Sequence, residues 1–112
     1  LDIDRNGNLY ASVTYSNSIM MWSSPIDGPI IVAGGNGWGY SSTQLPYPYG
    51  LSVDSSTNTL YVASYNMNNI VAWKINATSG AIVAGRNGTV GVSSYTLRYP
   101  RDVKCDAFGN LY

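Results

Sequence analysis

The stretch Leu51-Ser52-Val53-Asp54 decides the fold, because the chain contains three versions of it. The first is Leu1-Asp2-Ile3-Asp4 and the last is Val103-Lys104-Cys105-Asp106. An asparagine follows each final aspartate by four residues, and a Leu-Tyr pair follows the asparagine. These residues are Asn8, Asn58 and Asn110, with Leu9-Tyr10, Leu60-Tyr61 and Leu111-Tyr112. The chain is therefore built from a repeat of about 51 residues.

The residues between these marks also recur in register. The matched pairs are Ile19 with Ile70, Trp22 with Trp73, residues 31–34 with 82–85 (Ile-Val-Ala-Gly in both), Leu45 with Leu97, and Tyr47-Pro48 with Tyr99-Pro100. The repeat divides the chain into a first unit at residues 1–48, partial at its start, a second unit at 49–100, and the start of a third at 101–112. Each full unit ends in a linker.

Each unit is expected to contain four short strands. In the second unit they are predicted at about 49–54, 59–64, 70–75 and 80–85, because these segments are rich in Val, Ile, Tyr and Trp. Turn signals separate the strands, as at Asn6-Gly7 in the first unit. A four-stranded antiparallel unit repeated head to tail is typical of a β-propeller blade, and stability needs at least three repeats. The sequence predicts an all-β fragment of a larger ring.

Residues 48–54 (PYGLSVD), 58–64 (NTLYVAS) and 68–70 (NNI) resemble the NHL repeat family of propellers. The segment at 32–37, Val-Ala-Gly-Gly-Asn-Gly, is similar to one variety of this repeat. The resemblance covers essentially the whole chain and implies a six-bladed ring, with roughly four blades outside this segment. The chain departs from the family where Val13 and Ser64 replace an aspartate, and where Ser18 and Asn69 replace an arginine.

The charge balance argues against nucleic acid as a partner. Lys plus Arg and Asp plus Glu number six each, and histidine is absent. A nucleic-acid surface needs clustered basic residues, whereas the one basic concentration here, Arg86, Arg98, Arg101 and Lys104, is interrupted by aspartates and is predicted to be a solvated rim. No cofactor or metal is expected, and no apolar run is long enough to span a membrane. Recurrence in every unit predicts that Asp4, Asp54 and Asp106 hold turns.

Aromatic residues that recur, such as Trp22 and Trp73, are expected to pack between blades. Others are placed in loops, where binding residues commonly lie on a rigid scaffold. The turn between the second and third strands and the linker to the next unit should emerge at the same end of a blade. The residues predicted to cluster there as a binding surface are Tyr15, Asn17, Trp38, Tyr40, Tyr65, Asn66, Asn68 and Tyr95.

The leading prediction is a non-catalytic scaffold whose partners are a protein, peptide or glycan and the other blades of its ring. One alternative is the structural part of a propeller enzyme, since amidating lyases and lactonase-like rings resemble this repeat and hold zinc or calcium in blades that would lie outside this segment. Another is the substrate-recognition propeller of a ubiquitin ligase. The sequons at Asn76 and Asn87 could accept glycans, which favours an extracellular or cell-surface protein.

Overall fold

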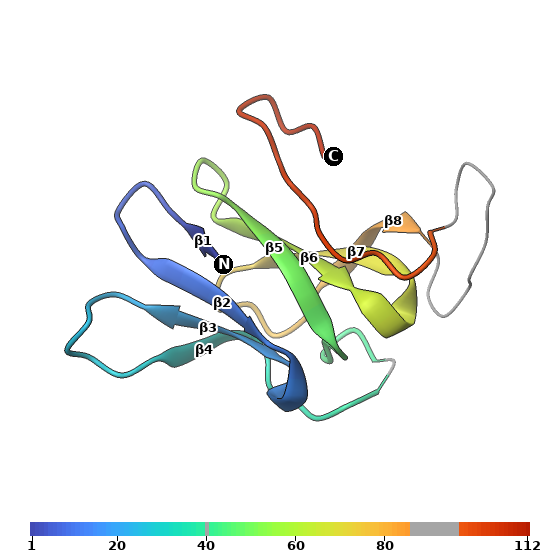
Figure 1. The fold of residues 1–112 in the computed structure, drawn as a ribbon, viewed down its shortest axis with the longest axis horizontal. Coiled ribbons are helices and arrows are strands. Elements are labelled where there is room, and N and C mark those ends of the chain that lie inside the picture. Colours follow the sequence, from blue (N-terminus) through green and yellow to red (C-terminus); the bar gives the residue numbers. More distant parts are fainter. Residues whose placement is uncertain (40, 86–96) are drawn as a thin grey trace.

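The computed structural model contains two four-stranded antiparallel sheets and describes residues 1–39, 41–85 and 97–112 (Figure 1). The first sheet has the order β1-β2-β3-β4, with strands at Asp2–Ile3, Leu9–Val13, Ser18–Trp22 and Ile30–Gly34. The second has the order β5-β6-β7-β8, with strands at Pro48–Asp54, Thr59–Ser64, Asn69–Lys74 and Ala81–Gly85. The strands predicted for the second unit are confirmed to within one residue at each boundary.

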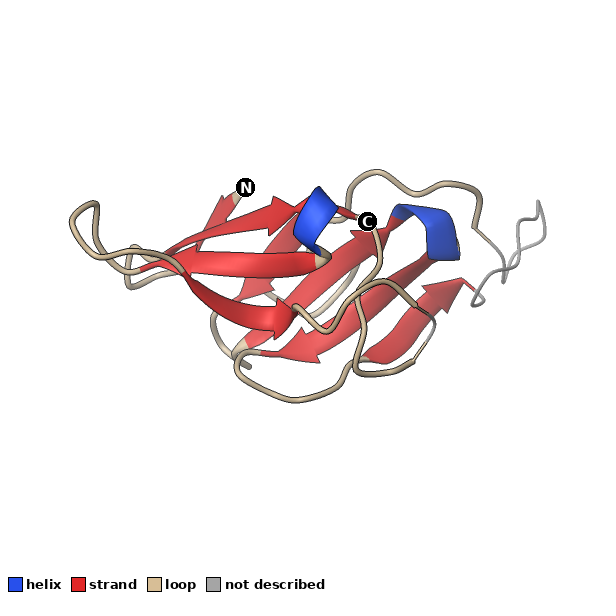
Figure 2. Ribbon diagram, turned by 90° about the horizontal axis from the view of Figure 1, so that it is seen from below, coloured by secondary structure: helices blue, strands red, loops and turns tan. Residues whose placement is uncertain are grey.

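Helical structure in the described residues is confined to two short 3-10 turns (Figure 2). They are η1 at Thr14–Ser16, between β2 and β3, and η2 at Tyr65–Met67, between β6 and β7. The all-β prediction is therefore confirmed. No helix in the parts of the chain that are described is long and apolar enough to cross a membrane.

Aspartates close the first turn of each unit. The Asp4 carboxylate accepts the backbone N–H groups of Asn6 and Asn8 at 2.9 Å each. The Asp106 carboxylate accepts those of Phe108 and Asn110 at the same distances, and Asp54 accepts the N–H of Ser56 at 3.0 Å. The prediction that these three aspartates hold turns is confirmed.

A buried hydrophobic cluster joins the two sheets. The residues before β5 contribute Tyr10, Ile19, Val32, Ala33 and Leu45, and the second sheet contributes Leu51, Leu60, Val62 and Trp73. A second cluster joins β6, β7, β8 and the second linker to the start of the third unit, and it contains Tyr61, Ala63, Ile70, Ala84, Leu97, Val103 and Leu111. Six members of the second cluster are the repeat counterparts of residues in the first. One interface therefore occurs twice, shifted by one unit.

The first sheet leaves one face open. Leu9, Ala11 and Trp22 line an open hollow of about 390 Å³ on this face, together with Pro25 and the first residue of the chain. Their counterparts in the second sheet are Leu60, Val62 and Trp73, all buried against the first sheet. We call Leu9, Ala11 and Trp22 the open face.

Side-chain hydrogen bonds tie the first strands of consecutive units together. The Asp2 carboxylate accepts the N–H of Val53 at 2.8 Å, and the Ser52 hydroxyl accepts the N–H of Cys105 at 3.1 Å. Asp2 and Ser52, which accept these bonds, occupy equivalent positions in the repeat, and so do Val53 and Cys105, which donate them. β1, β5 and the segment that contains Cys105 consequently lie side by side (Figure 1).

Candidate functional site

Two asparagines predicted as binding residues hold the linkers against the loops. Asn17 and Asn68 follow η1 and η2 and adopt left-handed conformations, with φ of 54° and 58°. The Asn17 amide oxygen accepts the N–H of Tyr47 at 3.1 Å, and the Asn68 amide oxygen accepts the N–H of Tyr99 at 2.9 Å. Both tyrosines have a φ of 47°. The same contact is therefore made in both units, and it places a tyrosine beside the loop.

Two glycines pack against the same asparagines. Gly34 and Gly85 end β4 and β8 with φ of +68° and +77°. A Cβ on Gly34 would collide with the carbonyl oxygen of Asn17, and a Cβ on Gly85 with that of Asn68. Both positions require glycine, because the left-handed backbone conformation disfavours any side chain and because no space is left for a Cβ.

Three tyrosines from separate segments stack beside η2. The Tyr65 ring centroid lies 4.8 Å from that of Tyr49 in β5 and 5.0 Å from that of Tyr99 in the second linker. The interplanar angles are 26° and 27°, so the rings are nearly parallel. Tyr49 and Tyr99 remain 40% and 44% exposed, which leaves aromatic surface available at both ends of the stack.

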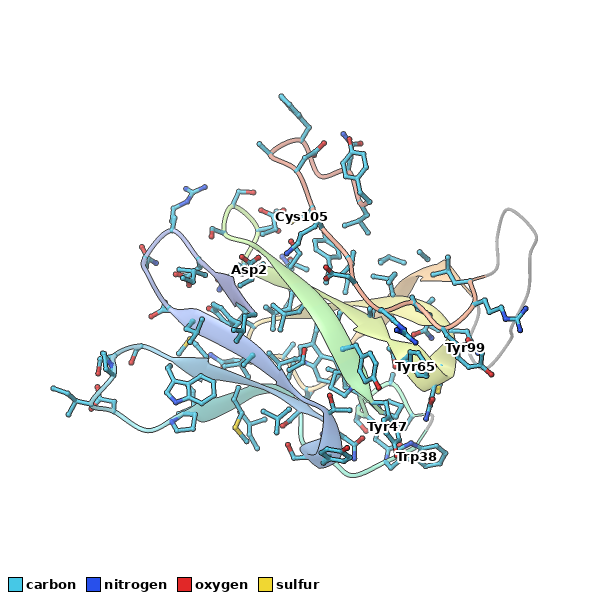
Figure 3. The ribbon with its side chains drawn as sticks, viewed as in Figure 1. Asp2, Trp38, Tyr47, Tyr65, Tyr99 and Cys105 are labelled. Carbon is cyan, nitrogen blue, oxygen red and sulfur yellow. The ribbon has the colours of Figure 1, made fainter. Side chains whose placement is uncertain are left out.

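Trp38 and Tyr47 lie at the same end of the molecule as this stack (Figure 3). Trp38 is 51% exposed and belongs to the loop that follows β4. Gln44 braces that loop, because its side-chain amide donates to the carbonyl oxygens of Asn36 and Trp38 at 3.1 and 3.4 Å. We call Trp38, Tyr47, Tyr49, Tyr65 and Tyr99 the aromatic end.

The guanidinium of Arg101 lies at the aromatic end. The Arg101 guanidinium carbon is 5.8 Å from the Tyr65 ring centroid, within the range of a cation–π contact. Arg101 is exposed, as expected for a rim residue, but its position over the tyrosine could not be inferred from its place in the sequence.

The structure gathers only some of the residues predicted for the binding surface. Trp38 and Tyr65 belong to the aromatic end, whereas Asn17 and Asn68 hold its linkers. Tyr15 is 94% exposed on η1, and Asn66 is exposed on η2. Tyr40 and Tyr95 lie outside the described residues.

Sequence reasoning missed Tyr47, Tyr49, Tyr99 and Arg101. Tyr99 belongs to a Tyr-Pro pair that recurs in both units, so its recurrence indicated packing rather than exposed surface. In β5, Pro48 is buried and Tyr49 is exposed. Strict alternation would put Tyr49 on the same face as the buried Leu51, but the register of β5 and β6 shifts between Pro48 and Leu51, so the sequence carried no signal for this outward-facing ring.

A small cavity of about 250 Å³ lies under the first linker. Gln44, Ser64, Met67, Asn69 and Ile82 contribute to its lining. It therefore adds polar groups near the aromatic end but offers little volume. Of the two predicted glycan acceptors, Asn76 is exposed in the loop between β7 and β8, and Asn87 lies outside the described residues.

Shifted pKa values are found for Asp4, Asp54 and Asp106 in the turns and for Tyr10 and Tyr61 in β2 and β6. Burial raises the pKa of Asp4, but hydrogen bonds from Asn8, Tyr10 and Asn6 outweigh it and leave the pKa below its ordinary value. Burial and the hydrogen bond to Asp4 raise the pKa of Tyr10 to about 12. Among the described residues, no group of three His, Cys, Asp or Glu side chains could hold a metal ion.

Comparison of the sequence with protein-family models finds no match. Comparison with curated proteins also finds none. Any functional inference therefore rests on the geometry and chemistry described above.

Proposed function

We propose that this chain is part of an NHL-type β-propeller, with two blades and the start of a third, that serves as a non-catalytic binding scaffold. Its aromatic end binds a protein, peptide or glycan. The repeated interface supports the blade architecture, since Ile19 packs between the sheets as Ile70 packs toward the third unit. A six-bladed ring would continue that stacking around an axis near β1 and β5.

The tyrosine stack is the observation that carries the binding proposal. Tyr49, Tyr65 and Tyr99 come from three segments and lie together at a surface where Trp38 is also half exposed. Aromatic rings supply large contact areas with few rotatable bonds, so they lose little conformational entropy on binding. Tyr and Trp are accordingly enriched among the residues that dominate binding energy.

The position of the acidic groups also favours binding over catalysis. Asp4 and Asp106 each accept hydrogen bonds from two backbone N–H groups, one asparagine amide and one tyrosine hydroxyl. Carboxylates held in this way stabilise turns, and their turns are at the end of the strands opposite η1 and η2.

A labelled sample of the chain on arrays of peptides and glycans tests the proposal. Tyr65→Leu removes the middle ring of the stack, and Trp38→Ala removes the exposed indole. Both variants should lose about tenfold or more in affinity for any ligand that the arrays detect. Tyr15→Ala is the matched control, because it deletes a more exposed tyrosine outside the stack, and it should bind as the unmodified chain does. Retained binding by Tyr65→Leu and Trp38→Ala would overturn the proposal.

The ring is tested separately by the mass of the native polypeptide, detected with an antibody to this segment. Six units of this length correspond to roughly 300 residues and about 33 kDa. A mass at or above that value supports the ring. A native product of 12.1 kDa, the mass of this chain, would contradict a ring formed within one polypeptide.

A further inference from the structure

The guanidinium of Arg101 is oriented but makes no ion pair or hydrogen bond to any described residue. The guanidinium carbon lies over the Tyr65 ring at 5.8 Å from its centroid, and a cation–π contact at this distance leaves the N–H edge of the guanidinium available. That edge matches the two oxygens of a carboxylate, which it can bind through two parallel hydrogen bonds.

The backbone of Arg101 is fixed on both sides. Its carbonyl oxygen accepts the N–H of Gly50 at 2.8 Å, and the Asp102 carboxylate accepts the N–H of Val103 at 2.9 Å. A Cβ on Gly50 would collide with Asp102 and with the Arg101 carbonyl, so glycine permits this close approach. Arg101 therefore loses less freedom on binding than an arginine on a loose loop would.

The distribution of charge favours an anionic ligand at this end. Asp4, Asp54 and Asp106 lie in the hairpin turns, and Asp27 lies in the turn between β3 and β4. Those turns are at the opposite end of the strands from η1 and η2. The aromatic end instead carries the exposed Arg101, next to Asp102, whose carboxylate accepts the N–H of Val103.

We propose that Arg101 and the tyrosine stack recognise a carboxylate side chain in an extended peptide, an inference that rests on the binding function proposed above. An extended peptide places alternate side chains on one face about 7 Å apart. A Glu or Asp can therefore meet Arg101 while the residue two positions away packs a flat apolar group on the exposed surface of Tyr99 or Tyr49. Arg101 supplies charge selection, and the rings supply contact area.

The test uses the full chain and blocked eight-residue peptides made in matched pairs. Each pair has Glu-Ser-Pro or Gln-Ser-Pro at its centre, with the flanking residues varied, and binding is measured by fluorescence anisotropy. The Glu member should bind about tenfold more tightly at low salt, and added sodium chloride should reduce that preference. Arg101→Gln should abolish the preference, so that the Glu and Gln members of each pair bind with equal affinity.

Arg98→Gln is the matched control, because it removes a neighbouring exposed cation that does not stack on Tyr65, and it should keep the preference. Tyr65→Leu should weaken both members of each pair. The carboxylate site would be overturned by equal binding of Glu and Gln peptides or by an unchanged preference in Arg101→Gln. It would also be overturned if the chain bound only neutral glycans or bound no peptide. If Tyr65→Leu still abolishes binding of an uncharged ligand, the proposed scaffold function survives; if it has no effect on any ligand, both proposals fail.

Discussion

Trp22 and Trp73 occupy the same position in two copies of one repeat, yet their surroundings differ. Trp73 is 1% exposed and donates its indole N–H to the Ala77 carbonyl at 3.0 Å. Trp22 is only partly buried and lines the open face. The difference arises because the first sheet covers the face that carries Trp73, whereas no described residues cover its counterpart. The burial of a residue in this fold is thus set by the adjacent unit as well as by its own strand.

The largest expected effect separates these two tryptophans. Trp73→Ala should lower the free energy of unfolding by about 3–5 kcal/mol, because it leaves a cavity between the sheets and an unpaired carbonyl. Trp22→Ala should lower it by about 1 kcal/mol, because the side chain already contacts solvent. Urea-induced unfolding of the two variants measures the difference.

Trp73→Phe sharpens this comparison, because it keeps a large ring but removes the hydrogen bond to Ala77. Its loss of stability should fall between those of the two alanine variants. Equal losses for Trp22→Ala and Trp73→Ala would contradict the assignment of the open face.

The repeat made the strands predictable, because identical patterns in two units point to the same local structure. The turn role of Asp4 could also be predicted, because a carboxylate directly after a strand can accept the N–H groups of the following turn, and its recurrence in each unit favours a structural role. The tyrosine stack could not be predicted in full. It joins Tyr49, Tyr65 and Tyr99 across 50 residues, and their meeting depends on how Asn68 positions the second linker.

A second comparison concerns two glycines with similar backbone conformations. Gly85 and Gly7 have φ of +77° and +84°, but only at Gly85 would a Cβ collide with a neighbour, the Asn68 carbonyl. Gly85→Ala should cost about 3 kcal/mol, from left-handed strain together with the collision. Gly7→Ala should cost about 1–2 kcal/mol, from strain alone. Thermal unfolding followed by circular dichroism would rank the two variants, and a larger loss at Gly7 would contradict the packing around Gly85.

A third comparison concerns the asparagines that hold the linkers. Asn68 is 2% exposed, whereas Asn17 is half buried. Asn68→Ala should cost about 2 kcal/mol and Asn17→Ala about 1 kcal/mol, because a lost hydrogen bond matters more where water cannot replace it. Urea titration of both variants measures the two losses.

Asn68→Asp tests whether the stability lost in Asn68→Ala comes from the missing hydrogen-bond acceptor or from the missing side-chain volume. It keeps a side-chain oxygen for the N–H of Tyr99, so it should retain more stability than Asn68→Ala. If Asn68→Asp and Asn68→Ala were equally unstable, the hydrogen bond to Tyr99 would not be the source of the effect.

The smallest expected effect is the response of the Asp4 turn to acid. The hydrogen bonds from Asn8, Tyr10 and Asn6 outweigh burial and hold the pKa of Asp4 below its ordinary value of 3.8. Because the unfolded chain takes up this proton at a higher pH than the folded chain, the contribution is fully present above about pH 4 and is lost as the pH falls through the folded pKa. Solvent screening limits it to less than about 1 kcal/mol. The urea midpoint measured between pH 6 and pH 2 should fall less steeply for Asp4→Asn than for the unmodified chain.

Asn8→Ala should also flatten that dependence, because Asn8 donates both its N–H and its side-chain amide to the carboxylate at 2.9 Å. An unchanged slope in both variants would mean that the turn is held by its backbone alone, through the bond from the Gly7 N–H to the Asp4 carbonyl.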